Sequence, residues 1–216
     1  MKKNIAIAFV LCVLLTLFAG CGNNSSESPE NETQNNEQES ETLSYERGIL
    51  TETGYESQYL DIKFTVPEGF VMATEEDILG MMQVGVEIMD LDKDTIDYSS
   101  LTTVYEMMVS SASGSPNVAL LTEKLMSNVT VEQYLDIVKS QLADVPMNYE
   151  FGDVTSVEIA GESYQQIVAS AEIKGTAFLQ KYIVRKFDDR MVCFVVTNTS
   201  ETEKELDTLM KAFTKY

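Results

Sequence analysis

The chemistry open to this chain is limited by its lack of histidine. Its 216 residues include 35 acidic and 15 basic side chains and three cysteines. Histidine is the usual general base near neutral pH and the commonest metal ligand, so both roles fall to other side chains here. Cys193 stands in the apolar run MVCFVV with no histidine to activate it, and we expect a small buried hydrophobe there. Because no nucleophile and base occur at a recognisable spacing, we expect no enzymatic activity and no cofactor.

The sequence has one candidate for a metal site, a run of alternating aspartates: Asp90, Asp92, Asp94 and Asp97. Every second residue of a curved loop can point a carboxylate at one cation, as in calcium loops. Lys93 adds a positive charge, however, while Thr95 and Leu101 replace the glycine and the bidentate glutamate of an EF-hand. We therefore interpret the run as a solvated acidic loop, with weak calcium binding as the alternative.

Methionines form the one group of adaptable apolar side chains, and the residues concerned are Met81, Met82, Met89, Met107 and Met108. Such side chains serve both ordinary core packing and promiscuous apolar binding sites. We favour core packing. The alternative is a pocket for an apolar small molecule or lipid, lined by Met81, Met82, Met107 and Met108, between a helix over residues 75–86 and a sheet.

The first 20 residues have the pattern of a signal peptide. Lys2 and Lys3 precede an apolar run over residues 5–18, which is short for a membrane span. The sequence Leu17-Phe18-Ala19-Gly20-Cys21 resembles the lipobox of bacterial lipoproteins, in which the cysteine thiol is acylated and the chain is cut before it. That resemblance implies a lipid anchor, with acyl chains such as palmitate, at Cys21 on the outer face of a bacterial membrane. An uncleaved anchor or an ordinary secretory signal is the alternative.

Residues 21–44 are expected to form an acidic tether after the lipidated cysteine. From Gly22 to Thr42 the sequence has no aliphatic, aromatic or basic residue, so it cannot bury enough surface to fold. A random coil of this length reaches roughly 25 Å. The alternative interpretation of this segment is a tail that a binding partner recognises. The formal net charge is −20, or −22 without Lys2 and Lys3. This charge excludes a nucleic-acid partner and a polybasic membrane contact, so the membrane must be reached through lipid.

Residues 45–216 show neither an internal repeat nor a second linker, and we expect one domain. Hydrophobic alternation and turn residues predict eight strands, over residues 49–53, 59–66, 103–111, 118–125, 152–159, 163–173, 177–187 and 191–197. Short turns such as Ala160-Gly161-Glu162 favour hairpins and antiparallel pairing.

Three helices are predicted from their N-terminal capping boxes. Thr74 with Asp77, Thr130 with Gln133, and Ser200 with Glu203 have the required spacing. The acidic residues Glu75, Glu76 and Asp77 fit a first helical turn better than a catalytic carboxylate pair. The buried stripe expected on the second helix comprises Val131, Tyr134, Leu135, Val138 and Leu142. The stripe expected on the last comprises Leu206, Leu209, Met210 and Phe213.

The resulting order, ββα ββα ββββα, predicts the α+β class. We expect a three-layer α/β/α sandwich with a central, mainly antiparallel sheet.

Several phrases of this domain resemble the PsbP-like family: residues 61–70 (DIKFTVPEGF), 104–108 (VYEMM), 117–118 (NV), 130–135 (TVEQYL) and 159–164 (IAGESY). That fold is shared by the PsbP protein of photosystem II, the Ran-binding Mog protein and DcrB-type bacterial lipoproteins. The family has no common catalytic site, so the resemblance implies a fold and a binding or accessory role only. We therefore expect a lipid-anchored extracytoplasmic binding module without catalytic activity, whose partner is an unidentified protein or small apolar ligand. A carrier of an apolar molecule in the methionine pocket is the alternative.

Overall fold

The computed structural model describes residues 44–82, 96–125, 127–173 and 175–216. The predicted signal peptide, Cys21, nearly all of the tether, and Asp90, Asp92 and Asp94 lie outside these residues. None of the helices in the described part of the chain is long and apolar enough to span a membrane.

An eight-stranded antiparallel sheet forms the centre of the fold. Its strands follow the order β4 (Phe70–Met72), β5 (Thr103–Ser111), β6 (Asn117–Lys124), β11 (Arg190–Thr199), β10 (Thr176–Phe187), β9 (Glu162–Ile173) and β7 (Glu150–Phe151), while β8 (Thr155–Ile159) also pairs with β9. The β8–β9 hairpin turns through Ala160 and Gly161, both with positive φ. This conformation is typical of the two-residue turns that match strand twist, and it explains the predicted hairpin.

A second, four-stranded antiparallel sheet was not predicted. It consists of β1 (Ile49–Thr51), β2 (Gly54–Ser57), β3 (Ile62–Thr65) and β12 (Phe213–Lys215), in that order. The predicted strand over residues 59–66 begins too early, because Tyr59 and Leu60 lie in the turn between β2 and β3. The prediction that Phe213 belongs to the buried stripe of the last helix is wrong, because Phe213 lies in β12 and pairs with Phe64 of β3.

The helices begin close to where their caps predict. α1 (Glu75–Met81) and α2 (Val131–Ala143) both start at complete capping boxes, at Thr74 and Thr130 respectively. α3 (Glu203–Lys211) instead follows a 3₁₀ turn at Ser200–Thr202, and Thr199 with Thr202 makes the local cap. The buried side chains of α2 and α3 match the expected stripes apart from Val131, Met210 and Phe213.

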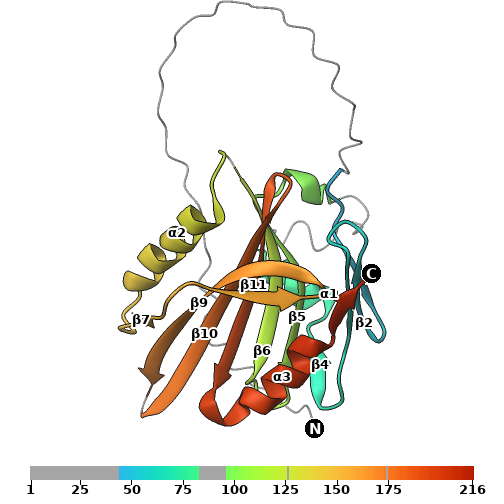
Figure 1. Ribbon diagram of the computed structural model, residues 1–216. Helices are drawn as coiled ribbons and strands as arrows, with labels where there is room; N and C mark the ends of the chain where they lie inside the picture. The colour runs from blue at the N-terminus through green and yellow to red at the C-terminus, as the bar shows by residue number, and fades with distance from the viewer. Residues whose placement is uncertain (1–43, 83–95, 126, 174) are drawn as a thin grey trace, which may run out of the picture.

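Two apolar cores lie on opposite faces of the large sheet. On one face, α1 and α2 pack against Tyr105, Leu121 and Cys193. On the other, the small sheet and α3 pack against residues such as Val192 and Phe194. Figure 1 shows α2 on one side of the large sheet, and the small sheet with α3 on the other. The antiparallel α+β class is therefore confirmed. The predicted three-layer α/β/α sandwich is not confirmed. The layer on one face of the large sheet contains the small sheet as well as α3.

Candidate functional site

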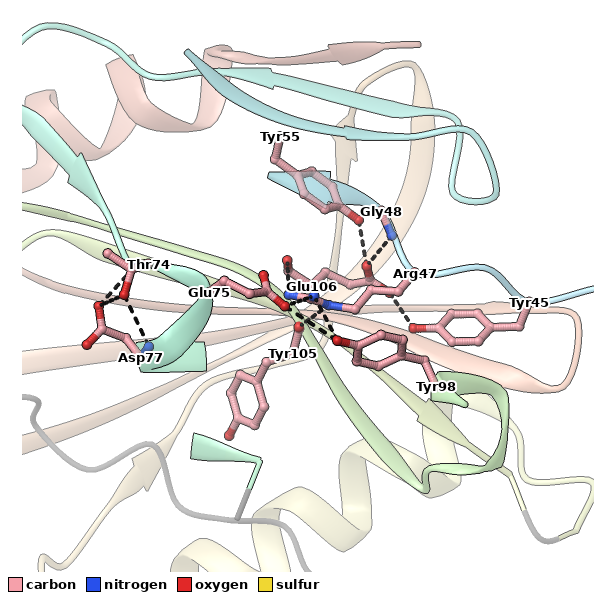
Figure 2. A network of polar contacts seen from close by, with 10 residues as sticks. All are labelled: Tyr45, Arg47, Gly48, Tyr55, Thr74, Glu75, Asp77, Tyr98, Tyr105 and Glu106. Atoms are coloured by element: carbon pink, nitrogen blue, oxygen red, sulfur yellow. Dashed lines mark hydrogen bonds and ion pairs between the residues drawn. The ribbon is translucent and has the colours of Figure 1, made fainter. Parts of the chain in front are cut away.

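A buried carboxylate, Glu106, lies in a network of polar contacts that joins several segments of the chain (Figure 2). The pairing of β5 with β6 shifts register between Tyr105 and Met107, which is a β-bulge at Glu106. The bulge allows Glu106 and Met107 to face the small sheet together. Two tyrosine hydroxyls and one amide satisfy the carboxylate: Tyr45 Oη donates at 2.7 Å, Tyr55 Oη at 2.8 Å and Gly48 N at 3.0 Å.

Gly48 is required for this close approach. A Cβ placed on Gly48 would overlap the ring and hydroxyl of Tyr55. Burial first, and then the charge of Glu106 and its hydrogen bond, raise the pKa of Tyr55 well above its ordinary value. The Tyr55 hydroxyl therefore stays protonated and keeps donating to the carboxylate.

Arg47 joins this cluster to the start of α1. Its Nε donates to the Tyr105 carbonyl at 3.0 Å and its Nη2 to the Glu106 carbonyl at 3.3 Å. Its Nη1 pairs with Glu75, and its guanidinium lies 5.1 Å from the centre of the Tyr98 ring. The bulge thus exposes backbone carbonyls that the arginine satisfies, and Glu75 neutralises the arginine.

A second buried cation, Arg190, lies behind Tyr45. Its guanidinium is 3.7 Å from the centre of the Tyr45 ring and donates to the carbonyl of Ser99 at 3.0 Å. Glu106, Arg47 and Arg190 were not predicted from the sequence. The signal for Glu106 was a lone charge inside the apolar strand VYEMMV, because such a charge is buried only with partners.

An open pocket of about 640 Å³ adjoins this cluster. Residues 44–50, Glu75 and residues 96–99 line it. Arg47, the one basic residue among the described residues of its lining, is already paired with Glu75. Asp97 is the one calcium candidate that the structure describes. Its Oδ1 accepts from Ser99 N at 3.1 Å and from Ser99 Oγ at 2.6 Å, so it caps the turn at Tyr98–Ser100. These Ser99 hydrogen bonds lower the pKa of Asp97. Within the described ranges no group of three or more metal-ligating side chains could hold an ion.

The methionines are not all brought together. Met107 is buried on the face that carries the small sheet, whereas Met108 is buried on the face that carries α1 and α2. Met81 and Met82 are half-buried against the latter core. The four therefore cannot line one pocket, because alternation on β5 sends the two strand methionines to opposite faces.

A groove of about 720 Å³ lies on the small-sheet face of the large sheet, between the β8–β9 hairpin and the pair α3 and β12. Ile183 and Val196, from β10 and β11, are buried apolar residues of its lining. Leu206 of α3 and Phe213 of β12 line the opposite side.

Three lysines also line this groove: Lys181, Lys211 and Lys215. Lys181 lies opposite Val196 in the sheet register, two residues from Ile183, which places it on the groove face of β10. Lys215 pairs with Asp61 at 3.0 Å, whereas Lys181 and Lys211 have no ion pair with any residue that the structure describes. The groove thus combines apolar walls with two lysines that form no salt bridge within the described residues, and Glu158 and Asp207 also belong to its lining.

The remaining buried acid, Glu123, lies on the α2 face of β6. Burial raises its pKa to about 7, and a side-chain interaction with Tyr134 of α2 opposes part of that shift. Cys193 is fully buried on the same face, as predicted.

No protein-family model and no curated protein matches the chain. Among solved structures, it is similar to cyanobacterial PsbP (CyanoP) from Synechocystis, with 11% identity and a TM-score of 0.46; the match covers 75% of this chain and 91% of that one. It is also similar to LpqN, a protein involved in cell envelope biogenesis of Mycobacterium tuberculosis, with 13% identity, a TM-score of 0.42, and 71% and 82% of the chains covered. One neighbour is thus a PsbP protein, the family that the sequence phrases resemble. With both TM-scores below 0.5, no ligand or function is transferred from these proteins.

Proposed function

We propose that this protein is a lipid-anchored binding module, without catalytic activity, on the outer face of a bacterial membrane. The lipobox-like residues ending at Cys21 support the anchor, and the acidic segment after it supports a tether of the PsbP-like lipoprotein kind. The binding surface is the groove between the β8–β9 hairpin and α3 with β12.

The observation that carries this proposal is the shape and lining of the groove. Its volume of about 720 Å³ lies within the range of ordinary ligand pockets, roughly 300–1,000 Å³. Apolar side chains with a few polar groups among them are typical of such sites. By contrast, the Glu106 carboxylate is buried and its hydrogen bonds are complete, so its role is to hold residues 45–48 and the small sheet on the large sheet.

The second candidate function is a carrier of an apolar small molecule. Because the four methionines do not line one pocket, we place the bound molecule of such a carrier in this groove. Met210, half-buried on α3, is the one methionine of its lining. A groove that opens to solvent favours exchange of the bound molecule over permanent storage.

Native mass spectrometry of the full chain, extracted from membranes in detergent, tests the proposal. We expect a complex with one molecule of a straight-chain C16 amphiphile. Met210→Trp should fill the groove and reduce the complex, whereas Thr208→Trp, on an exposed position of the same helix, should leave it unchanged. The absence of any complex, or equal effects of the two substitutions, would contradict binding in the groove.

A further inference from the structure

We propose that the groove binds a single-chain anionic amphiphile, with its acidic head at Lys181 and Lys211 and its chain along the apolar walls. This inference rests on the proposed function and adds the chemical class of the ligand.

The lining of the groove differs in charge from the chain as a whole. The whole chain carries a net charge of −20, yet the groove is lined by three lysines against the two acidic residues Glu158 and Asp207. The lining is therefore far less acidic than the chain as a whole, so an anion is repelled less here than the net charge alone would suggest.

Two of the three groove lysines are not held in a salt bridge with a described residue. Lys215 is already paired with Asp61, but within the described part of the chain Lys181 and Lys211 form no ion pair. Lys181 is only half-exposed, and the buried residues Ile183 and Val196 are its neighbours on the groove face of the sheet. A lysine with an apolar stem and a charged tip suits a ligand that has an acidic head and an apolar chain.

The volume of the groove suits a ligand with a single chain. At roughly 30 Å³ for each water-sized group, a groove of about 720 Å³ holds about two dozen such groups. The non-hydrogen atoms of one C16 fatty acid fit within that number, whereas those of a phospholipid with two such chains exceed it, so part of the larger lipid would lie in solvent. The acidic surface also disfavours contact with anionic headgroups in a bilayer, so the occupant is a free single-chain molecule.

The test compares head groups on one chain length. The full chain in detergent is incubated separately with hexadecanoate, hexadecanol, hexadecyltrimethylammonium and dihexadecanoyl phosphatidylglycerol, and complexes are counted by native mass spectrometry at pH 7.5. We expect hexadecanoate to bind at least about tenfold more tightly than the alcohol, and the cation and the two-chain lipid to bind least.

Charge reversal at the lysines provides the matched variants. Lys181→Glu with Lys211→Glu should lower hexadecanoate binding about tenfold or more and leave hexadecanol binding nearly unchanged. Lys204→Glu, exposed on the same helix but outside the groove, should change neither. Thermal unfolding confirms that each variant is folded. Should the double variant fail to fold, Lys181→Gln and Lys211→Gln are measured singly, with an expected loss of about threefold each.

The outcomes separate the two proposals. If all single-chain amphiphiles bind alike and the lysine substitutions have no effect, the anionic specificity is wrong while binding in the groove stands. Preference for the two-chain lipid would overturn the single-chain occupant. If no amphiphile binds, the proposed function fails as well.

Discussion

At the residue scale, the structure assigns Glu106 the role of a buried acceptor that holds three segments together. Its carboxylate accepts hydrogen bonds from Tyr45, Gly48 and Tyr55. Burying a charge is costly unless its partners are complete, so the stability of this cluster depends on every donor being present.

Glu106→Gln should therefore be strongly destabilising although it is nearly isosteric. Both carboxylate oxygens of Glu106 accept hydrogen bonds, and the amide nitrogen of glutamine cannot accept, so at least one donor loses its acceptor inside the core. We expect a loss of about 2–4 kcal/mol in the free energy of unfolding, measured in urea. Glu172→Gln, exposed on β9, serves as the control and should cost less than about 0.5 kcal/mol. Equal costs for the two would contradict a structural role for the Glu106 carboxylate.

Glu123 predicts a pH dependence of stability. Its pKa is raised by burial to about 7 in the folded protein, against an ordinary 4.5. Below pH 4.5 the Glu123 side chain is protonated in both the folded and the unfolded protein, so its burial in the folded protein carries no cost for burying a charge. Between pH 4.5 and 7 the unfolded chain ionises first, so the free energy of unfolding falls, by on the order of 3 kcal/mol in total.

Glu123→Gln removes this titration. The variant should be more stable than the wild type at pH 8, by up to about 3 kcal/mol, and much closer to it at pH 5. Urea unfolding at the two pH values measures the difference, with Glu132→Gln on the exposed face of α2 as the control. A gap between variant and wild type that is independent of pH would show that Glu123 does not titrate in this range.

At the element scale, the C-terminal segment is held by the small sheet. The Phe213 ring lies 4.5 Å from that of Phe64 and 5.0 Å from that of Phe194, centre to centre. β12 therefore connects the small sheet to the core of the large one and closes one side of the groove.

Phe213→Ala should cost on the order of 3 kcal/mol or more, through lost burial and a residual cavity. Lys211→Ala, on the exposed end of α3, should cost no more than about half a kcal/mol. Both are measured by urea unfolding of the same preparation. If both substitutions were nearly neutral, the C-terminal segment would not be docked on the domain.

Local signals predicted the elements that local chemistry determines. The capping boxes at Thr74 and Thr130 each span only four residues, and both helices begin there. β12 could not be predicted in this way, because a strand of three residues is formed by pairing with Phe64, far away in the sequence. The bulge at Glu106 likewise depends on donors from residues 45–55, and the position of Lys181 in a groove depends on the packing of α3.

At the scale of the whole molecule, the domain is expected to be held near a membrane by lipid alone. Cys21→Ser should therefore release the protein from the membrane fraction or leave it unprocessed, because the acyl chains are lost and the acidic surface opposes binding to anionic lipid. Fractionation followed by immunoblotting checks this. Membrane-bound, fully processed Cys21→Ser protein would contradict the lipid anchor.

The central claim is that ligand binds in the groove and not in the polar pocket at residues 44–50 and 96–99. Hydrogen–deuterium exchange of the full chain, with and without hexadecanoate, tests this location directly. We predict added protection in residues 155–161, 181–183 and 206–215, which line or flank the groove, and no change at the polar pocket. Protection confined to residues 44–50 and 96–99, or no protection at a saturating concentration, would contradict the account.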